Sequence, residues 1–167
     1  LKIALPKEYF AAASEDVLAK TKEAIAKLEA MGATVEEVSL PAADYALAAY
    51  YIIVPAEVAS NLSRYDGVRY GFRSEKSEDL DALYKNTRGE GFMPENKRRI
   101  MIGNFVLSSG FYDAYFLKAA KARTLIVKEY EKAFEKCDFI LSPVTPNPAF
   151  KLGEKTSDPV TMYLEDA

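Results

Sequence analysis

The sequence predicts an α/β fold, and three observations lead to that prediction. Two strand-like segments, 1–6 and 33–41, each end at a proline. Between them, residues 17–31 place apolar side chains at helical spacing, and Gly32 follows where a helix commonly ends. A strand, a helix and a second strand with short joints form a βαβ unit. We therefore expect parallel strands joined by a right-handed crossover.

The middle of the chain predicts helices. Residues 42–62 are apolar on nearly every side, which is typical of a helix buried in a large body, and Pro55 predicts a kink or a joint within it. Residues 79–92 predict a short helix and a glycine-rich bend, and a further helix follows in which Pro94 occupies the first position. Residues 110–137 carry one apolar stripe and predict the longest helix.

The last part of the chain predicts a third strand that runs into a loop. Residues 138–150 begin as a strand and then contain three prolines, and such a strand end is a common place for a site in an α/β sheet. The tail from Gly153 shows no regular pattern. Because there are no repeats, low-complexity tracts or Gly/Ser linkers, we expect one domain, or a fragment of one, over residues 1–167.

Composition narrows the class of protein. The 167 residues are 49% hydrophobic and 28% charged with a net charge of -3, which is a globular profile and argues against a domain that depends on phosphate contacts. With no signal peptide and no apolar run long enough for a bilayer, we expect a cytoplasmic protein without a membrane partner. The single Cys137 excludes an internal disulfide. Because Leu1 lies inside a predicted strand, we expect a fragment of a longer protein.

The chain contains no histidine. This excludes a Ser-His-Asp triad, a Cys-His dyad and any histidine-ligated metal within the chain, and leaves acid–base chemistry to Lys, Tyr, Asp, Glu or the backbone. The aspartates lack the spacing of a metal-binding loop, and no glycine-rich nucleotide motif is present. Ser108 and Ser109 have no evident base and are better explained as helix-end residues.

A basic triplet, Lys97 to Arg99, opens a helix that is otherwise apolar. The helix dipole disfavours cations at this end, so the triplet needs a reason. One interpretation is an anionic ligand held by a guanidinium together with the helix-end amides. The other is a set of salt bridges to Glu90, Glu95 or another segment.

The segment RYDGVRYGFR, residues 64–73, combines three arginines, three aromatic rings and two glycines. The glycines predict a loop with sharp turns. A nucleic-acid platform would need basic surroundings and a repeated stacking pattern, and both are missing. We expect a loop that buries its rings and pairs its arginines with Asp66, Glu57 or Glu90.

Several blocks occur in order through nearly the entire chain: RYDGVRYG, EGF followed by KRRIM, LSSGFYDAY, FILSPVTPNPAFKLGEK and DPVTMYLEDA. In these blocks the chain resembles the A subunits of bacterial tRNA-dependent amidotransferases, a branch of the amidase-signature family. The resemblance implies a layered α/β/α fold with a small mixed sheet and long flanking helices. It also implies that the chain is the C-terminal part of a single amidase domain.

The resemblance implies release of ammonia from glutamine by a Ser, a second Ser on a cis peptide, and a Lys. These residues lie upstream of the matched stretch, so we expect no catalytic residue and no activity in this chain alone. A partner B subunit, with ATP and Mg, would use the ammonia to amidate Glu-tRNA(Gln), and in some enzymes Asp-tRNA(Asn). A small C subunit would complete a heterotrimer.

The resemblance also implies three glutamine-binding residues. Arg99 matches the arginine that holds the α-carboxylate, Asp166 matches the acid that holds the α-ammonium group, and Tyr50 matches a tyrosine of the same pocket. A shift of one residue would exchange Arg98 for Arg99. Two alternatives stay open: another amidase-signature hydrolase acting on a small amide, and a stand-alone α/β binding module.

Overall fold

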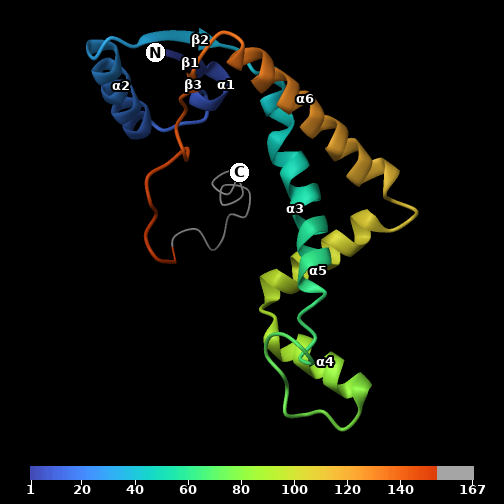
Figure 1. Cartoon of the computed structure of the whole chain (residues 1–167). Coiled ribbons are helices and arrows are strands. Elements are labelled where there is room, and N and C mark those ends of the chain that lie inside the picture. The colour runs from blue at the N-terminus through green and yellow to red at the C-terminus, as the bar shows by residue number, and fades with distance from the viewer. Residues whose placement is uncertain (154–167) are drawn as a thin grey trace. The chain divides into compact units, whose positions relative to one another are not determined.

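The computed structural model describes residues 1–153, and Asp166 lies outside them (Figure 1). The chain separates into two compact units. Among the described residues, the sheet unit contains 1–47 and 121–153, and the helical unit contains 48–120. The expectation of a single domain stays a prediction.

The sheet unit is built on three parallel strands in the order β2-β1-β3. Strand β1 spans Lys2–Pro6, β2 spans Thr34–Val38, and β3 spans Phe139–Ile140. In the register of the sheet, Lys2 pairs with Thr34 and Ile3 pairs with Phe139. The predicted α/β class and the parallel pairing of the first two strands are confirmed. The third strand opens the segment 138–150 as predicted and gives way to a loop before the first of its prolines, Pro143.

Helix α2, Glu15–Ala30, connects β1 to β2 as predicted. Ser14 has an extended backbone at the N-cap position. Gly32 ends the turn after the helix with a φ of 93°, a conformation that glycine adopts without steric cost. A four-residue helix, α1, Lys7–Phe10, follows β1 directly and was not predicted.

The core of the sheet unit lies on β1 and beneath helix α6, Lys118–Phe134. Ile3 and Ala4 of β1 are buried, as is Ala42 in the 3₁₀ helix η1, Pro41–Tyr45. The Glu129 carboxylate of α6 accepts a hydrogen bond from the Ala42 amide at 2.9 Å. Side chains of α6 therefore fix the segment that leaves the sheet.

The helical unit contains most of α3, Ala46–Leu62, together with α4, Leu80–Gly91, and α5, Pro94–Leu107 (Figure 1). The predicted helices are confirmed with two corrections: residues 41–45 form the 3₁₀ helix η1, so α3 begins only at Ala46, and α4 continues to Gly91 through the glycines that predicted a bend. The prediction of one α-helix over 110–137 is wrong in its first turns, where Asp113–Leu117 form a π-helix, η2. The Leu117 amide donates to the carbonyl of Tyr112, five residues earlier, at 3.0 Å.

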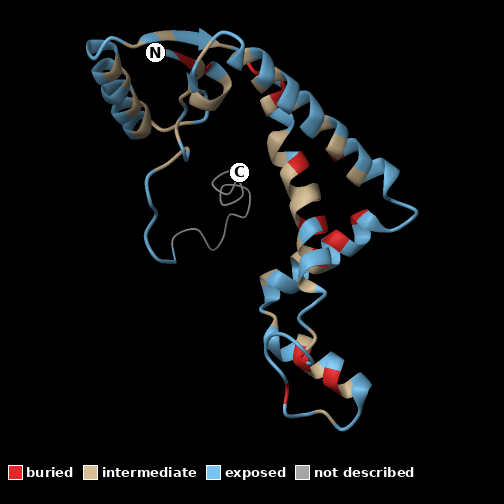
Figure 2. Cartoon of the chain, in the orientation of Figure 1, coloured by how far each residue is buried: buried red, intermediate tan, exposed pale blue. Residues whose placement is uncertain are grey.

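Helices α3 and α5 meet through small residues. A Cβ atom placed on Gly103 of α5 would lie only 2.0 Å from the carbonyl oxygen of Pro55 in α3 and 2.6 Å from the Cβ of Ala59. Gly103, Pro55 and Ala59 are all buried, and Figure 2 shows buried segments on both helices. This close approach fixes the neighbouring turns, which carry Tyr50 and Arg99.

Within residues 1–153, no helix has both the length and the apolar character that crossing a bilayer requires.

Candidate substrate-recognition site

The first turn of α5 joins two arginines to one carboxylate. Glu95 accepts a hydrogen bond from Arg99 Nε at 3.0 Å through Oε1 and another from Arg98 Nη1 at 2.7 Å through Oε2. An acidic residue in the first turn is also stabilised by the helix dipole. Glu95 therefore compensates the positive charges that the helix end disfavours.

The two arginines differ in their surroundings. The side chain of Arg98 is 59% exposed, whereas that of Arg99 is 22% exposed. The guanidinium carbon of Arg99 lies 5.8 Å from the ring centroid of Tyr51, which is within range of a cation–π contact. Of the two positions that a register shift would exchange, Arg99 is thus the enclosed one.

Tyr50 belongs to the same cluster. Hydrogen bonding to Glu95 and then to Tyr50 raises the pKa of Arg99 above its ordinary value. The rings of Tyr50 and Tyr51 meet edge to face, with centroids 5.0 Å apart. The structure therefore brings together Tyr50 and Arg99, two of the three residues predicted to bind glutamine. The third, Asp166, lies outside the described residues.

This cluster can orient a guanidinium for an anion. Glu95 fixes the Nε side of Arg99, and the α3 rings limit the directions that the rest of the group can take. A planar guanidinium in a fixed orientation suits a carboxylate, which it can bind through two parallel hydrogen bonds. The arrangement supports recognition of a small carboxylate and contains no nucleophile of its own.

The salt-bridge interpretation of the basic triplet is confirmed for Arg98 and Arg99, with Glu95 as their partner. Lys97 instead donates to the carbonyl of Gly89 at 2.6 Å. Glu90 forms no salt bridge with these three basic residues within residues 1–153. Its carboxylate instead accepts hydrogen bonds from Ser74 and Lys76. The salt bridge between Glu95 and Arg99 is compatible with an anionic ligand at Arg99, because Glu95 orients the guanidinium and leaves it charged.

Sequence reasoning did not assign Glu95 and Tyr51 to the site. The signal for Glu95 was present, since an acid in the first turn of a helix and a base four residues later lie on one face. Tyr51 had no comparable signal, because α3 is apolar on nearly every side and its sequence does not show which ring faces α5.

The expectation for the loop at 64–73 is wrong. Its rings are exposed, at 42% for Tyr65, 57% for Tyr70 and 54% for Phe72. None of its three arginines forms a salt bridge within the described residues. The reason is that Thr87 and Arg88 of α4 contact the backbone of the loop on its inner side. The space next to α4 is therefore occupied, and the rings remain exposed.

Ser108 behaves as the helix-end explanation predicts, since its hydroxyl donates to the carbonyl of Phe105 at 2.7 Å. Among the described residues, no group of His, Cys, Asp and Glu side chains is arranged to hold a metal ion.

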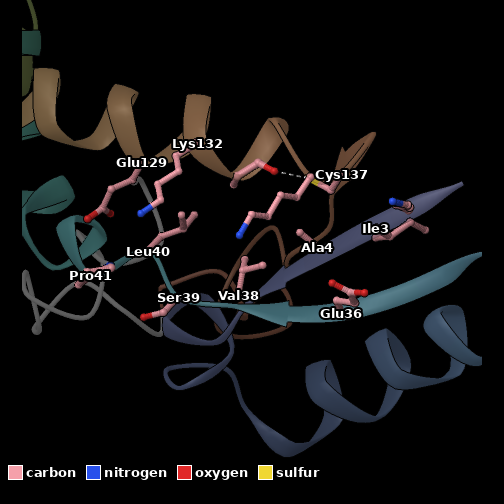
Figure 3. A pocket seen from close by; sticks show the side chains of 13 residues that line it. Ile3, Ala4, Glu36, Val38, Ser39, Leu40, Pro41, Glu129, Lys132 and Cys137 are labelled. Carbon is pink, nitrogen blue, oxygen red and sulfur yellow. Dashed lines mark hydrogen bonds between the residues drawn. The ribbon is translucent and has the colours of Figure 1, made fainter.

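A separate cavity of about 310 Å³ lies in the sheet unit, between α6 and the strands β1 and β2 (Figure 3). Two of its polar groups have partners in the chain: Glu129 accepts from the Ala42 amide, and the Cys137 thiol donates to the carbonyl of Ala133 at 3.2 Å. No residue of the predicted site lines it. The cavity therefore gives no reason to move the site away from Arg99.

Comparison with protein families gives a match to the family described as Amidase over residues 1–167. The chain therefore belongs to the amidase family. It is 59% identical over 167 residues to the A subunit of the glutamyl-tRNA(Gln) amidotransferase of Coxiella burnetii (strain Dugway 5J108-111), covering 99% of this chain and 35% of that protein. It is 57% identical to the protein of the same name from Bacillus pumilus, covering 34% of it.

Solved structures give the same result for the fold. A crystal structure of the A subunit of the Thermotoga maritima glutamyl-tRNA(Gln) amidotransferase matches with a TM-score of 0.67 and 40% identity, over 99% of this chain and 31% of that one. A crystal structure of an amidase matches with a TM-score of 0.65 at 24% identity, which shows the fold alone. The chain thus spans about a third of the length of the relatives it matches.

Proposed function

We propose that the full-length protein containing this chain is the glutamine-hydrolysing subunit of a tRNA-dependent amidotransferase. The observation that carries the proposal is the 56% to 59% identity, over 167 residues, to proteins named as the A subunits of glutamyl-tRNA(Gln) amidotransferases. The Arg99 cluster gives this similarity a chemical meaning, because it is suited to one pole of an amino-acid substrate.

In this proposal Arg99 binds the α-carboxylate of glutamine, Asp166 binds the α-ammonium group, and Tyr50 forms part of the pocket wall. A free amino acid carries one anion and one cation on the same carbon, so two opposite charges in the site identify it. Each charge-assisted hydrogen bond contributes about 1.5 to 3 kcal/mol. Simple acyl amides lack both charges and should bind much more weakly.

The amide-cleaving Ser, Ser and Lys belong to the part of the protein outside this chain. Ammonia passes to a B subunit that binds ATP and Mg, where it converts Glu-tRNA(Gln) to Gln-tRNA(Gln), and a C subunit completes the cytoplasmic heterotrimer. Misacylated tRNA reaches the enzyme through the B subunit. The contribution of this chain is substrate recognition.

The test is ammonia release by the purified full-length protein, assembled with its partners, from glutamine and from a simple acyl amide such as propionamide. We expect a clear preference for glutamine, with ammonia transferred to Glu-tRNA(Gln) when ATP is present. Preference for propionamide would support the alternative amidase-signature hydrolase. Ammonia release by residues 1–167 alone would contradict the assignment of catalysis to another part of the protein.

A further inference from the structure

The loop of residues 64–73, called here the arginine loop, is held rigidly by α4. Arg88 donates through Nη1 to the carbonyls of Leu62 and Tyr65, at 3.2 and 3.0 Å. The buried Ser74 ends the loop by donating its amide to Thr87 Oγ1 at 3.1 Å. Both ends of the loop are thus attached to one helix.

The turn inside the arginine loop is also fixed. Asp66 Oδ1 accepts hydrogen bonds from the amides of Val68, at 2.8 Å, and Arg69, at 3.4 Å. Gly67 has a φ of 79°, and a Cβ atom there would lie 2.7 Å from Thr87 Cγ2. The backbone is therefore ordered before any ligand arrives, which reduces the entropy that binding would cost.

Most side chains of this loop are exposed. Val68 is 52% exposed, and Tyr70 and Phe72 are more than half exposed. Arg64, Arg69 and Arg73 are exposed and form no salt bridge in the part of the chain that the structure describes. Figure 2 shows the loop before α4 as mostly exposed. Arginine and aromatic side chains on a rigid backbone are the residues that dominate binding energy at protein interfaces.

A hollow of about 300 Å³ lies between the loop and α4, next to these side chains. Rings and aliphatic groups line it: Leu62, Tyr65, Phe72, Thr87 and Phe92, with Gly71 and Gly91. Protein interfaces commonly place one apolar side chain of the partner in such a pocket, surrounded by polar contacts.

The charge pattern separates a protein partner from a nucleic acid. The arginine loop contains three arginines and one aspartate, whereas the next 18 residues, 74–91, contain five acidic and three basic residues. A long phosphate backbone would extend over this acidic neighbour and be repelled by it, while a compact acidic segment of a protein can place its carboxylates against the arginines of the loop.

We propose that the arginine loop is a docking surface for a protein subunit that presents carboxylates around one apolar side chain. The carboxylates bind the exposed arginines, and the apolar side chain enters the hollow between the loop and α4. The proposal rests on the proposed function, which supplies the partner subunits of the amidotransferase.

The test uses the full-length protein together with its purified B and C subunits. The affinity of the full-length protein for these two partners is measured by calorimetry for wild type, for Arg69→Glu and for Tyr70→Ser. The matched control is Arg123→Glu, which reverses an exposed arginine of α6 that also has no salt bridge within residues 1–153. We expect Arg69→Glu to weaken association at least tenfold, Tyr70→Ser severalfold, and Arg123→Glu less than twofold.

Further measurements separate the alternatives. The melting temperature of the full-length protein without its partners should stay within about 2 °C of wild type for both loop variants. A larger fall would overturn the proposal, since the loop would then be covered by its own chain. Unchanged association would also overturn it, as would normal assembly combined with lost tRNA binding. Failure of the proposed function would appear separately, as a wild-type complex that releases no ammonia from glutamine.

Discussion

Arg99 is held through its Nε by Glu95, one turn earlier in α5, with 3.0 Å between nitrogen and oxygen. The same carboxylate also accepts a hydrogen bond from Arg98, so Glu95 pairs with two arginines. The result is a guanidinium whose direction is set within its own helix. Its packing against α3 then depends on the contact between Gly103 and Pro55.

Replacing Arg99 tests the recognition of glutamine directly. In the assembled enzyme, Arg99→Ala should raise KM for glutamine about ten- to hundredfold, because one charge-assisted contact worth about 1.5 to 3 kcal/mol is lost. Arg98→Ala and Arg64→Ala should change KM less than about threefold, since both side chains are exposed. Steady-state kinetics with glutamine measures all three, and equal effects of Arg98 and Arg99 would refute the assignment.

Glu95 is expected to act as a positioning residue. Glu95→Gln keeps the shape of the side chain but removes the charge that orients Arg99, so KM for glutamine should rise about three- to tenfold, a loss of about 1 kcal/mol. The value of kcat should remain close to wild type.

Its matched control is Asp81→Asn, which disrupts the exposed ion pair between Asp81 and Lys85, also four residues apart. This variant should not change KM. If Glu95→Gln lowers only the melting temperature and leaves KM unchanged, Glu95 has a structural role alone.

Gly103 tests the contact between α3 and α5. Gly103→Ala would place a methyl group against the carbonyl of Pro55, so the helices must separate, at a cost of about 1 to 3 kcal/mol. Gly89→Ala is the control, because no atom lies within 4 Å of the added Cβ. That change should stabilise α4 by about 0.5 to 1 kcal/mol. Denaturant unfolding of the full-length protein measures both, and equal effects would show that the predicted contact is absent.

Replacing Glu90 tests a contact whose contribution to stability depends on pH. Hydrogen bonding to Lys76 and then to Ser74 holds the pKa of Glu90 below its ordinary value. A group with a lowered folded-state pKa stabilises the fold above its unfolded pKa, and this stabilisation is lost as pH falls through the folded value.

The melting temperature of Glu90→Gln should therefore fall below that of wild type at neutral pH, and the difference should shrink below about pH 4. Glu78→Gln, at an exposed position without a salt bridge in residues 1–153, is the control and should show no such trend. A difference for Glu90→Gln that stays constant with pH would contradict the explanation.

The elements that sequence predicts well are those with local end signals. Pro6, Gly32 and Pro41 bound the first strand, helix and second strand, and the parallel pairing then follows from the short connection. Residues 110–117 were harder, because an apolar stripe has nearly the same spacing in an α-helix and in one π turn. The rings of Phe105, Phe111 and Tyr115 contact one another in the structure, and their spacing in the sequence does not predict these contacts.

The candidate site shows a similar limit. The sequence places Arg98 and Arg99 side by side with equal chemistry, and only their packing distinguishes them. In the arginine loop no periodicity indicates which face is covered, so the orientation of its rings was predicted wrongly. Such a loop is determined by long-range contacts, here from Thr87 and Arg88, rather than by its own residues.

The charge of Arg99 and the absence of histidine predict how glutamine binding depends on pH. The chain has no histidine, and the raised pKa of Arg99 keeps its guanidinium charged throughout the neutral pH range. Affinity for the carboxylate end of glutamine should therefore be flat across neutral pH. Any slope in the rate of ammonia release over that interval must then arise from the ammonium of glutamine or from the cleaving groups, so a pH profile reports on those groups and not on the carboxylate contact.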